Sequence, residues 1–135
     1  MSNDPILFVD DNLTSRLLNC AVLRDCGFEV LEARSYAEAC RYIQEYPRLA
    51  ALVTSLDLAN EAEGFDVSRC ARASNAQMPV VYLSGTDVQR YVAEGVSGSR
   101  FIPRPLDPYQ IVRALDDAAP LRLPDWTERS GLRSE

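Results

Sequence analysis

Short apolar runs alternate along the chain with longer segments whose apolar residues recur at helical spacing. Residues 6–9 (ILFV) are too few for a helix and stop at two acidic residues, which is typical of a strand buried on both faces. Further short apolar runs predict strands at residues 28–33, 49–54, 79–83 and 100–103. The alternation predicts a chain built from repeated strand–helix units.

A segment of helical pattern follows each predicted strand. The first helix is predicted to begin at Asn12 or Thr14 and to stop at Gly27. Its apolar residues at helical spacing are Leu13, Leu17, Leu18, Ala21 and Val22. Ser35 and Glu38 form a capping box that predicts the start of the second helix. The remaining helices are predicted at residues 65–74, 87–96 and 107–118. Five such units predict an α/β protein whose parallel sheet is covered by helices on both faces.

The length allows one compact domain. The chain has 135 residues, of which 47% are hydrophobic and 25% charged, so it can bury a core of its own. We expect residues 1–119 to form this domain and residues 120–135 to form a C-terminal tail. The tail is expected either to be frayed or to dock its apolar residues Leu121, Leu123 and Trp126 on the domain or on a second subunit.

The composition excludes several kinds of catalysis. All fourteen cationic residues are arginine, and histidine is absent. Schiff-base chemistry needs a lysine amine, and Ser-His or Cys-His nucleophiles need an imidazole, so these classes and a histidine phosphocarrier are excluded. Zinc sites built on histidine are excluded too. The four cysteines, Cys20, Cys26, Cys40 and Cys70, contain no CxxC pair, and we interpret them as small apolar residues of a reduced protein.

The net charge argues against two kinds of partner. At −6, with no local cluster of arginines, the chain is not expected to bind nucleic acid. No apolar run approaches the length of a membrane span, and residues 1–5 do not resemble a secretory leader. We therefore expect a cytoplasmic protein without a membrane partner.

Polar residues stand at the ends of the predicted strands. In an open parallel sheet, functional groups collect at the carboxyl ends of the strands. These ends carry Asp10, Asp11, Ser55, Asp57, Ser84 and Arg104. Two adjacent acids can hold one Mg²⁺, directly or through waters. The alternative is structural, because Asp11 or Asn12 could cap the first helix.

Four motifs in this order resemble the receiver domain of bacterial response regulators, from residue 5 to about residue 119. They are ILFVDDN at 6–12, a strand end at Ser55 that lies 44 residues after Asp11, YLSG at 82–85 and FIPRP at 101–105. The resemblance implies a flavodoxin-like, five-stranded α/β domain of strand order 2-1-3-4-5. It also implies a two-component phosphorelay, in which a histidine kinase passes a phosphoryl group to an aspartate at the end of strand three, with Mg²⁺.

Two residues at the reaction centre depart from the family pattern. By position, Asp10 and Asp11 match the metal-binding acids, and Ser84 matches the hydroxyl residue that senses the phosphoryl group. Ser55 stands where the family has the acceptor aspartate, and Arg104 stands where it has lysine. The resemblance also implies a cis bond between Arg104 and Pro105.

The acceptor position rests on the spacing to a glycine. Some receivers have glycine nine positions after the acceptor, and the interval from Ser55 to Gly64 is nine. Aligning Asp57 instead gives an interval of seven and lengthens strand three past the polar Thr54 and Ser55. We therefore favour Ser55 as the acceptor position and keep Asp57 as a surrogate.

The departures predict a nearly inert site. A serine hydroxyl needs a neighbouring base to become a nucleophile, and the chain has no histidine. The loss of one carboxylate leaves weak Mg²⁺ binding at best, or no cofactor. Arg104 presents a planar fork where lysine has a compact ammonium. We expect it to pair with Asp10, Asp11 or Asp57, the alternative being a surface arginine of little energetic weight.

The resemblance also assigns a switch and an output face. Phe101 occupies the aromatic switch position, although it could equally be a core residue of strand five. The face formed by helix four, strand five and helix five is the usual partner or dimer surface of receivers. Here it carries Arg90, Tyr91, Arg100, Arg113 and Asp117. Such charged faces are more often simply solvated.

The sequence thus predicts a single-domain pseudo-receiver that acts by protein–protein binding and not as an enzyme. Its partners would be a histidine kinase, another signalling regulator, or a second copy that forms a homodimer through the face of helices four and five. The alternative function is a working receiver that uses Asp57 as the phosphoacceptor with Mg²⁺. A third reading is a domain that binds a different ligand in the acidic pocket.

Overall fold

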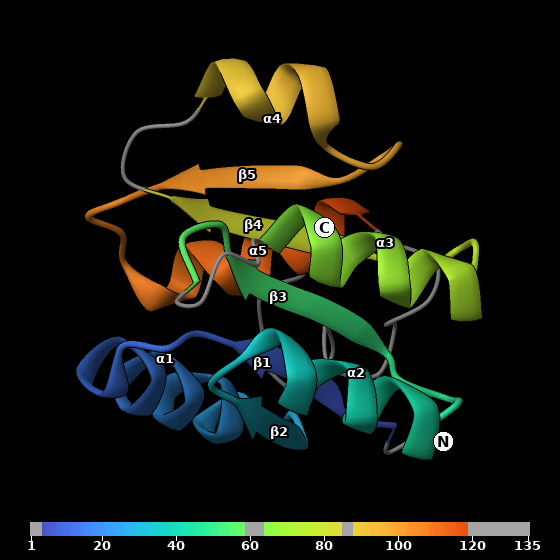
Figure 1. The fold of residues 1–135 in the computed structure, drawn as a ribbon. Helices are drawn as coiled ribbons and strands as arrows, with labels where there is room; N and C mark the ends of the chain where they lie inside the picture. The colour runs from blue at the N-terminus through green and yellow to red at the C-terminus, as the bar shows by residue number, and fades with distance from the viewer. Residues whose placement is uncertain (1–3, 59–63, 85–87, 119–135) are drawn as a thin grey trace, which may run out of the picture.

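The computed structural model describes residues 4–58, 64–84 and 88–118, and within them five parallel strands form one sheet in the order β2-β1-β3-β4-β5 (Figure 1). The strands are β1 (Ile6–Val9), β2 (Val30–Ala33), β3 (Ala51–Ser55), β4 (Val80–Ser84) and β5 (Arg100–Pro103). The helices are α1 (Leu13–Asp25), α2 (Tyr36–Glu45), α3 (Gly64–Ser74), α4 (Val88–Glu94) and α5 (Pro108–Ala118). The predicted flavodoxin-like α/β fold and its strand order are confirmed.

The element bounds differ slightly from the predicted ones. The second strand begins at Val30, two residues later than predicted, and the third and fourth strands end one residue later, at Ser55 and Ser84. Polar Ser55 and Ser84 are buried in the sheet, which a reading based on hydrophobicity misses. Asp87, the expected start of the fourth helix, and the expected tail at 120–135 lie outside the described residues.

The core has two layers, one on each face of the sheet. Along β1, Ile6 and Phe8 pack under α1 and α5, whereas Leu7 and Val9 pack under α2 and α3. All four side chains are fully buried. A strand covered on both faces has no solvent side, which explains why its sequence is continuously apolar rather than alternating. This packing fixes the strand ends from which the functional groups project.

Helix α1 lies where it was predicted, but the core takes a different face of it. Asn12 is the N-cap, and its side-chain Oδ1 accepts a hydrogen bond from the Ser15 N–H at 2.8 Å. The buried residues of α1 are Asn19, Cys20 and Leu23. Three of the leucine and valine positions that predicted the helix, Leu13, Leu17 and Leu18, are instead 59%, 53% and 57% exposed. Helical spacing locates a helix but does not say which of two apolar stripes faces the core.

The other helix ends follow local chemistry. Ser35 caps α2 by accepting from the Glu38 N–H at 3.1 Å, and the Glu38 carboxylate accepts from the Arg34 N–H, one residue before the usual capping-box partner. Gly27 follows α1 with a φ of 99°, a left-handed conformation that glycine adopts without strain. Asp107 accepts from the Tyr109 N–H at the start of α5. Among the described residues, no helix is long and apolar enough to cross a membrane.

The four cysteines are free thiols, as the sequence predicted. Cys20 is fully buried on the core side of α1, and this burial, with a smaller contribution from Glu32, raises the pKa of its thiol from 9.0 to about 12. The thiol therefore keeps its proton in the folded state at a pH where the unfolded chain has lost it.

The raised pKa of Cys20 predicts alkaline destabilisation. Between pH 9 and 12 the unfolded state binds fewer protons than the folded state, so the free energy of unfolding falls as the pH rises. We expect a loss of about 1 kcal/mol between pH 7.5 and about pH 10 from this thiol. Urea unfolding of the parent and of Cys20→Ala at both pH values measures it. An equal pH dependence in the two proteins would contradict the assignment to Cys20.

Candidate functional site

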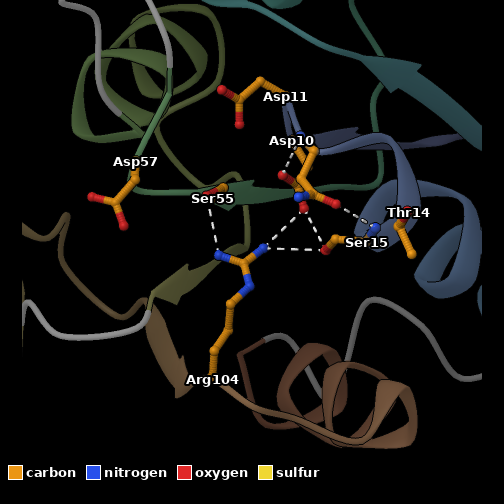
Figure 2. A pocket seen from close by; sticks show the side chains of 8 residues that line it. Asp10, Asp11, Thr14, Ser15, Ser55, Asp57 and Arg104 are labelled. Atoms are coloured by element: carbon orange, nitrogen blue, oxygen red, sulfur yellow. Dashed lines mark hydrogen bonds and ion pairs between the residues drawn. The ribbon is translucent and has the colours of Figure 1, made fainter.

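A cleft of about 540 Å³ opens at the carboxyl ends of β1, β3 and β5 (Figure 2). Its lining consists of Asp10, Asp11, Asn12, Thr14, Ser15, Ser55, Asp57 and Arg104. The structure thus brings together five of the six polar residues predicted to meet at this edge of the sheet. The sixth, Ser84, is buried at the end of β4, where its carbonyl accepts a hydrogen bond from the Arg104 N–H at 2.8 Å.

Asp10 is the buried carboxylate of the cleft. It follows β1 directly and is only 1% exposed. Its Oδ1 accepts from the Asn12 N–H at 3.0 Å, and its Oδ2 accepts from the Ser15 hydroxyl at 2.6 Å. A buried charge is tolerated only when it is paired and hydrogen-bonded, and these two bonds supply part of that compensation.

Arg104 supplies the opposite charge. One guanidinium nitrogen, Nη2, lies 2.8 Å from Asp10 Oδ2, and the other, Nη1, donates to the Ser55 hydroxyl at 3.2 Å (Figure 2). The side chain of Arg104 is 28% exposed, so the pair is partly screened by solvent. The two nitrogens of the planar guanidinium thus link Asp10, after β1, to Ser55, at the end of β3. A lysine ammonium would have to make both contacts through its single nitrogen.

The expected pairing of Arg104 is therefore present, and Asp10 is its partner. Within the described residues, Asp11 and Asp57 form no ion pair with it, and both residues are exposed on the cleft wall (Figure 2). The peptide bond from Arg104 to Pro105 is cis, as predicted. The cleft therefore contains one satisfied carboxylate and two that remain open to solvent.

Gly64, the first residue of α3, lies against the backbone of Ser55 and Leu56 at the end of β3. The Gly64 N–H donates to the Leu56 carbonyl at 3.0 Å. A Cβ on Gly64 would lie 2.3 Å from the carbonyl oxygen of Ser55, so only glycine permits this approach. The nine-residue interval from Ser55 to Gly64 thus has a steric cause. It is Ser55, and not Asp57, whose side chain points to the guanidinium.

Two contributors to the site were missed at the sequence level. Ser15 donates to Asp10 and contacts Arg104 Nη2 at 3.3 Å, and Arg16 donates to the Asp10 backbone carbonyl at 2.7 Å. Both lie in the first turns of α1. A serine three residues after the N-cap is so common in helices that its spacing alone gives no functional signal.

The predicted switch residue Phe101 belongs to a row of aromatic rings. It is half-buried on β5 and stacks on Tyr91 of α4, with ring centroids 5.1 Å apart. The row continues through Tyr82 to Phe65, with centroid distances of 5.7 and 5.2 Å. Burial raises the pKa of the Tyr82 hydroxyl, which donates to Ser68 of α3. The row therefore connects α4 to α3.

Part of the predicted output face is used within the chain. Arg90 lies over the Phe65 ring at 5.2 Å and bonds the Glu94 carboxylate at 3.1 Å. Tyr91 is half-buried and donates to the Ser99 carbonyl at 2.8 Å. These two residues stabilise α4 on the domain. Arg100, Arg113 and Asp117 remain exposed on the same face.

The donor set of the cleft does not fit a magnesium ion in this arrangement. Magnesium requires several oxygen ligands placed around it, and Asp10 Oδ2 is already shared by Ser15 and Arg104. In the part of the chain that the structure describes, no three acidic or thiol groups converge as a metal site would need. The guanidinium places a fixed positive charge where a cation would have to approach the carboxylate.

The strand order, the two acids after β1, the buried serine at the end of β4 and the cleft at this edge of the sheet are the features of a response-regulator receiver fold. No protein-family model matches the sequence, and no curated protein matches it. Solved structures do match. A response regulator receiver protein from Sinorhizobium medicae is 27% identical, with a TM-score of 0.84, and the match covers 90% of this chain and 98% of that one.

Two further structures show the same fold. A receiver domain protein from Clostridium thermocellum is 24% identical, with a TM-score of 0.78 over 85% of this chain and 93% of that one. The receiver domain of a sensor histidine kinase from Pseudomonas aeruginosa, solved with a magnesium ion coordinated in its active-site cleft, is 21% identical, with a TM-score of 0.73 over 85% and 96% of the two chains. These two likenesses show the fold, and the 27% identical receiver protein from Sinorhizobium medicae supports a response-regulator-like signalling role for this chain.

Proposed function

We propose that this chain is a pseudo-receiver of a two-component system that signals by binding proteins, without phosphorylation as the controlling event. The observation that carries the proposal is the position of the Arg104 guanidinium, which bonds Asp10 and Ser55 at once. The serine at the end of β3 removes the negative charge of an acceptor aspartate, and Arg104 places a planar guanidinium where the family has a compact ammonium.

The chemistry of Ser55 supports this function. A carboxylate is a ready nucleophile at neutral pH, whereas a serine hydroxyl must lose a proton to a nearby base. The hydroxyl of Ser55 accepts a hydrogen bond from Arg104 Nη1, which lowers the electron density on the oxygen that would attack. The chain has no histidine to act as the base. Ser55 is therefore proposed to serve as a fixed contact of the arginine and not as an acceptor.

The proposed partners follow from the fold. Receiver folds occur in response regulators and in sensor histidine kinases, as the two kinds of similar structure show. A receiver that is held in one state by its own arginine can still present the surfaces that such partners recognise. We propose a histidine kinase, another regulator or a second copy of the chain as the binding partner, in a cytoplasmic setting and without catalytic turnover.

Intact-mass spectrometry after incubation with Mg²⁺ and acetyl phosphate tests the proposal. The parent chain is expected to gain no phosphoryl adduct. Ser55→Asp restores the acceptor, and Ser55→Asp with Arg104→Lys also removes the planar fork that holds Asp10, so the double variant is expected to gain an adduct most readily. Asp57→Asn is the matched control, since it removes a cleft carboxylate that makes no ion pair with Arg104.

A second candidate function depends on Asp57. Its exposed carboxylate lines the cleft and could accept a phosphoryl group with Mg²⁺. An adduct on the parent chain that is labile to hydroxylamine and is lost in Asp57→Asn would establish this function and overturn the pseudo-receiver proposal. If Mg²⁺ or another small ligand instead stabilises the parent without forming an adduct, ligand binding in the acidic pocket is favoured.

A further inference from the structure

An apolar face on α1 has no partner among the described residues. Leu13, Leu17 and Leu18 are each more than half exposed, and Ala21 beside them is exposed as well. Leu13, Leu17 and Ala21 follow one another at four-residue spacing, which places them on one side of the helix, and Leu18 lies beside them. This side points away from the sheet. We call Leu13, Leu17, Leu18 and Ala21 the α1 leucine face.

The leucine face is not a by-product of core packing. The opposite side of α1 already supplies Cys20 and Leu23 to the core beneath α1 and α5. The other large exposed apolar side chains of the described residues are separate from one another: Tyr36 on α2, Tyr46 just after it, Val92 on α4 and Tyr109 on α5. Three leucines gathered on one solvent-facing helix side are typical of a covered surface.

The chain itself supplies an occupant of the right chemistry. The described part ends at Ala118, the last residue of α5, and seventeen residues follow, at 119–135. Leu121, Leu123 and Trp126 are concentrated in the first half of this segment, and they include the one tryptophan of the chain. Three large apolar residues so close together have little reason to be exposed to water.

The geometry allows the segment to reach the face. Helices α1 and α5 each follow a parallel strand, pack against the same sheet face and contact each other, so they run in the same direction as neighbours. From the end of α1 to Leu17 is about 12 Å along the helix. The eight residues from Ala118 to Trp126 can extend to about 26 Å. The first half of the segment therefore spans the path without strain.

We propose that residues 121–126 dock on the α1 leucine face of the same chain. Attachment through α5 gives the segment an effective concentration in the millimolar range, which a second copy or a separate protein reaches only at unusual abundance. Leu13 follows the cleft residues Asp11 and Asn12 directly. Any protein that binds the α1 leucine face therefore has to displace the docked segment. The proposal is independent of whether the cleft accepts a phosphoryl group.

Trp126 makes the contact measurable, because all tryptophan fluorescence of the chain comes from it. In the full chain, its emission is expected at shorter wavelength than in urea, with reduced quenching by acrylamide and no dependence on protein concentration. In Leu17→Glu with Leu18→Glu, both measures are expected to move to the values of the unfolded chain. The matched control is Val92→Glu, because Val92 lies on α4, away from the leucine face, and is 78% exposed. This variant is expected to keep both the emission wavelength and the quenching of the parent.

Each alternative gives a different result. Emission at the unfolded position in the parent, or protection that persists in Leu17→Glu with Leu18→Glu, overturns the proposal, because the tryptophan is then free or docked elsewhere. Protection that disappears on dilution together with a dimer in sedimentation assigns the face to a second copy instead. If the glutamates unfold the domain, Leu121→Asp with Leu123→Asp replaces them: loss of protection supports the docking and unchanged protection overturns it.

Discussion

Gly64→Ala is expected to lower the free energy of unfolding by about 3 kcal/mol, the upper part of the range for overpacking a close contact. The new Cβ would stand 2.3 Å from the carbonyl oxygen of Ser55 and 3.0 Å from the Cα of Leu56. Both are backbone atoms of a buried segment, so neither can move aside as a side chain would. Relief requires α3 to shift away from the end of β3, and this breaks the hydrogen bond from the Gly64 N–H to Leu56.

Urea unfolding of parent and variant measures this cost, and Gly98→Ala is its control. Gly98 has a φ of +74°, but no atom lies within 4 Å of the position that its Cβ would take. That substitution is expected to cost only about 1 kcal/mol, from the left-handed backbone alone. If the two variants were equally destabilised, backbone conformation and not the approach of Gly64 to Ser55 would explain the requirement for glycine.

The same contact gives a structural role to the glycine from which the position of Ser55 was argued. A glycine that must pass close to the carbonyl at the end of β3 leaves a fixed interval in the sequence, and the interval from Ser55 to Gly64 carried the alignment. The strands were predictable for a similar reason. Each of β1, β3 and β4 is buried along its whole length, so continuous apolar runs mark them within two residues.

Other features depended on three-dimensional information that the sequence does not contain. Three acids were candidates to pair with Arg104. Asp10 is the one that pairs, because it is buried at the end of β1 and β5 ends where the arginine can reach it. Ser15 was missed because its contact with Arg104 joins two positions that lie 89 residues apart in the chain. Two sides of α1 are apolar enough to pack against the sheet, and the side that does so carries Cys20 and Leu23.

Arg104→Ala is expected to lower the free energy of unfolding by about 2 kcal/mol. The Asp10 carboxylate is 1% exposed and loses its cation, while the bonds from the Asn12 N–H and the Ser15 hydroxyl remain. Breaking a fully buried pair costs more, but the arginine side chain is 28% exposed, so solvent already weakens the interaction. Arg104→Lys is expected to fall between parent and alanine variant, since it keeps the charge but loses the planar fork.

Arg100→Ala is the control for the loss of an arginine, because Arg100 begins β5 and Arg104 directly follows it. Arg100 is exposed, and its one described bond is a 3.3 Å contact with the Asp117 carbonyl, so its removal is expected to change stability by less than about 0.5 kcal/mol. Thermal unfolding of the parent and the three variants ranks the costs. A cost for Arg104→Ala no larger than for Arg100→Ala would show that the ion pair does not stabilise the cleft.

The same variant separates a structural arginine from one that excludes a metal. Without the guanidinium, Asp10 Oδ2 is released beside exposed Asp11, and two adjacent carboxylates can then share a magnesium ion. Mg²⁺ is therefore expected to raise the unfolding temperature of Arg104→Ala while leaving the parent unchanged, because a ligand stabilises only the state that binds it. Arg104→Ala with Asp11→Asn is expected to lose the response. An equal rise in the parent would mean that the cleft binds the ion with the arginine in place, and the guanidinium would then be a neighbour of the metal and not its substitute.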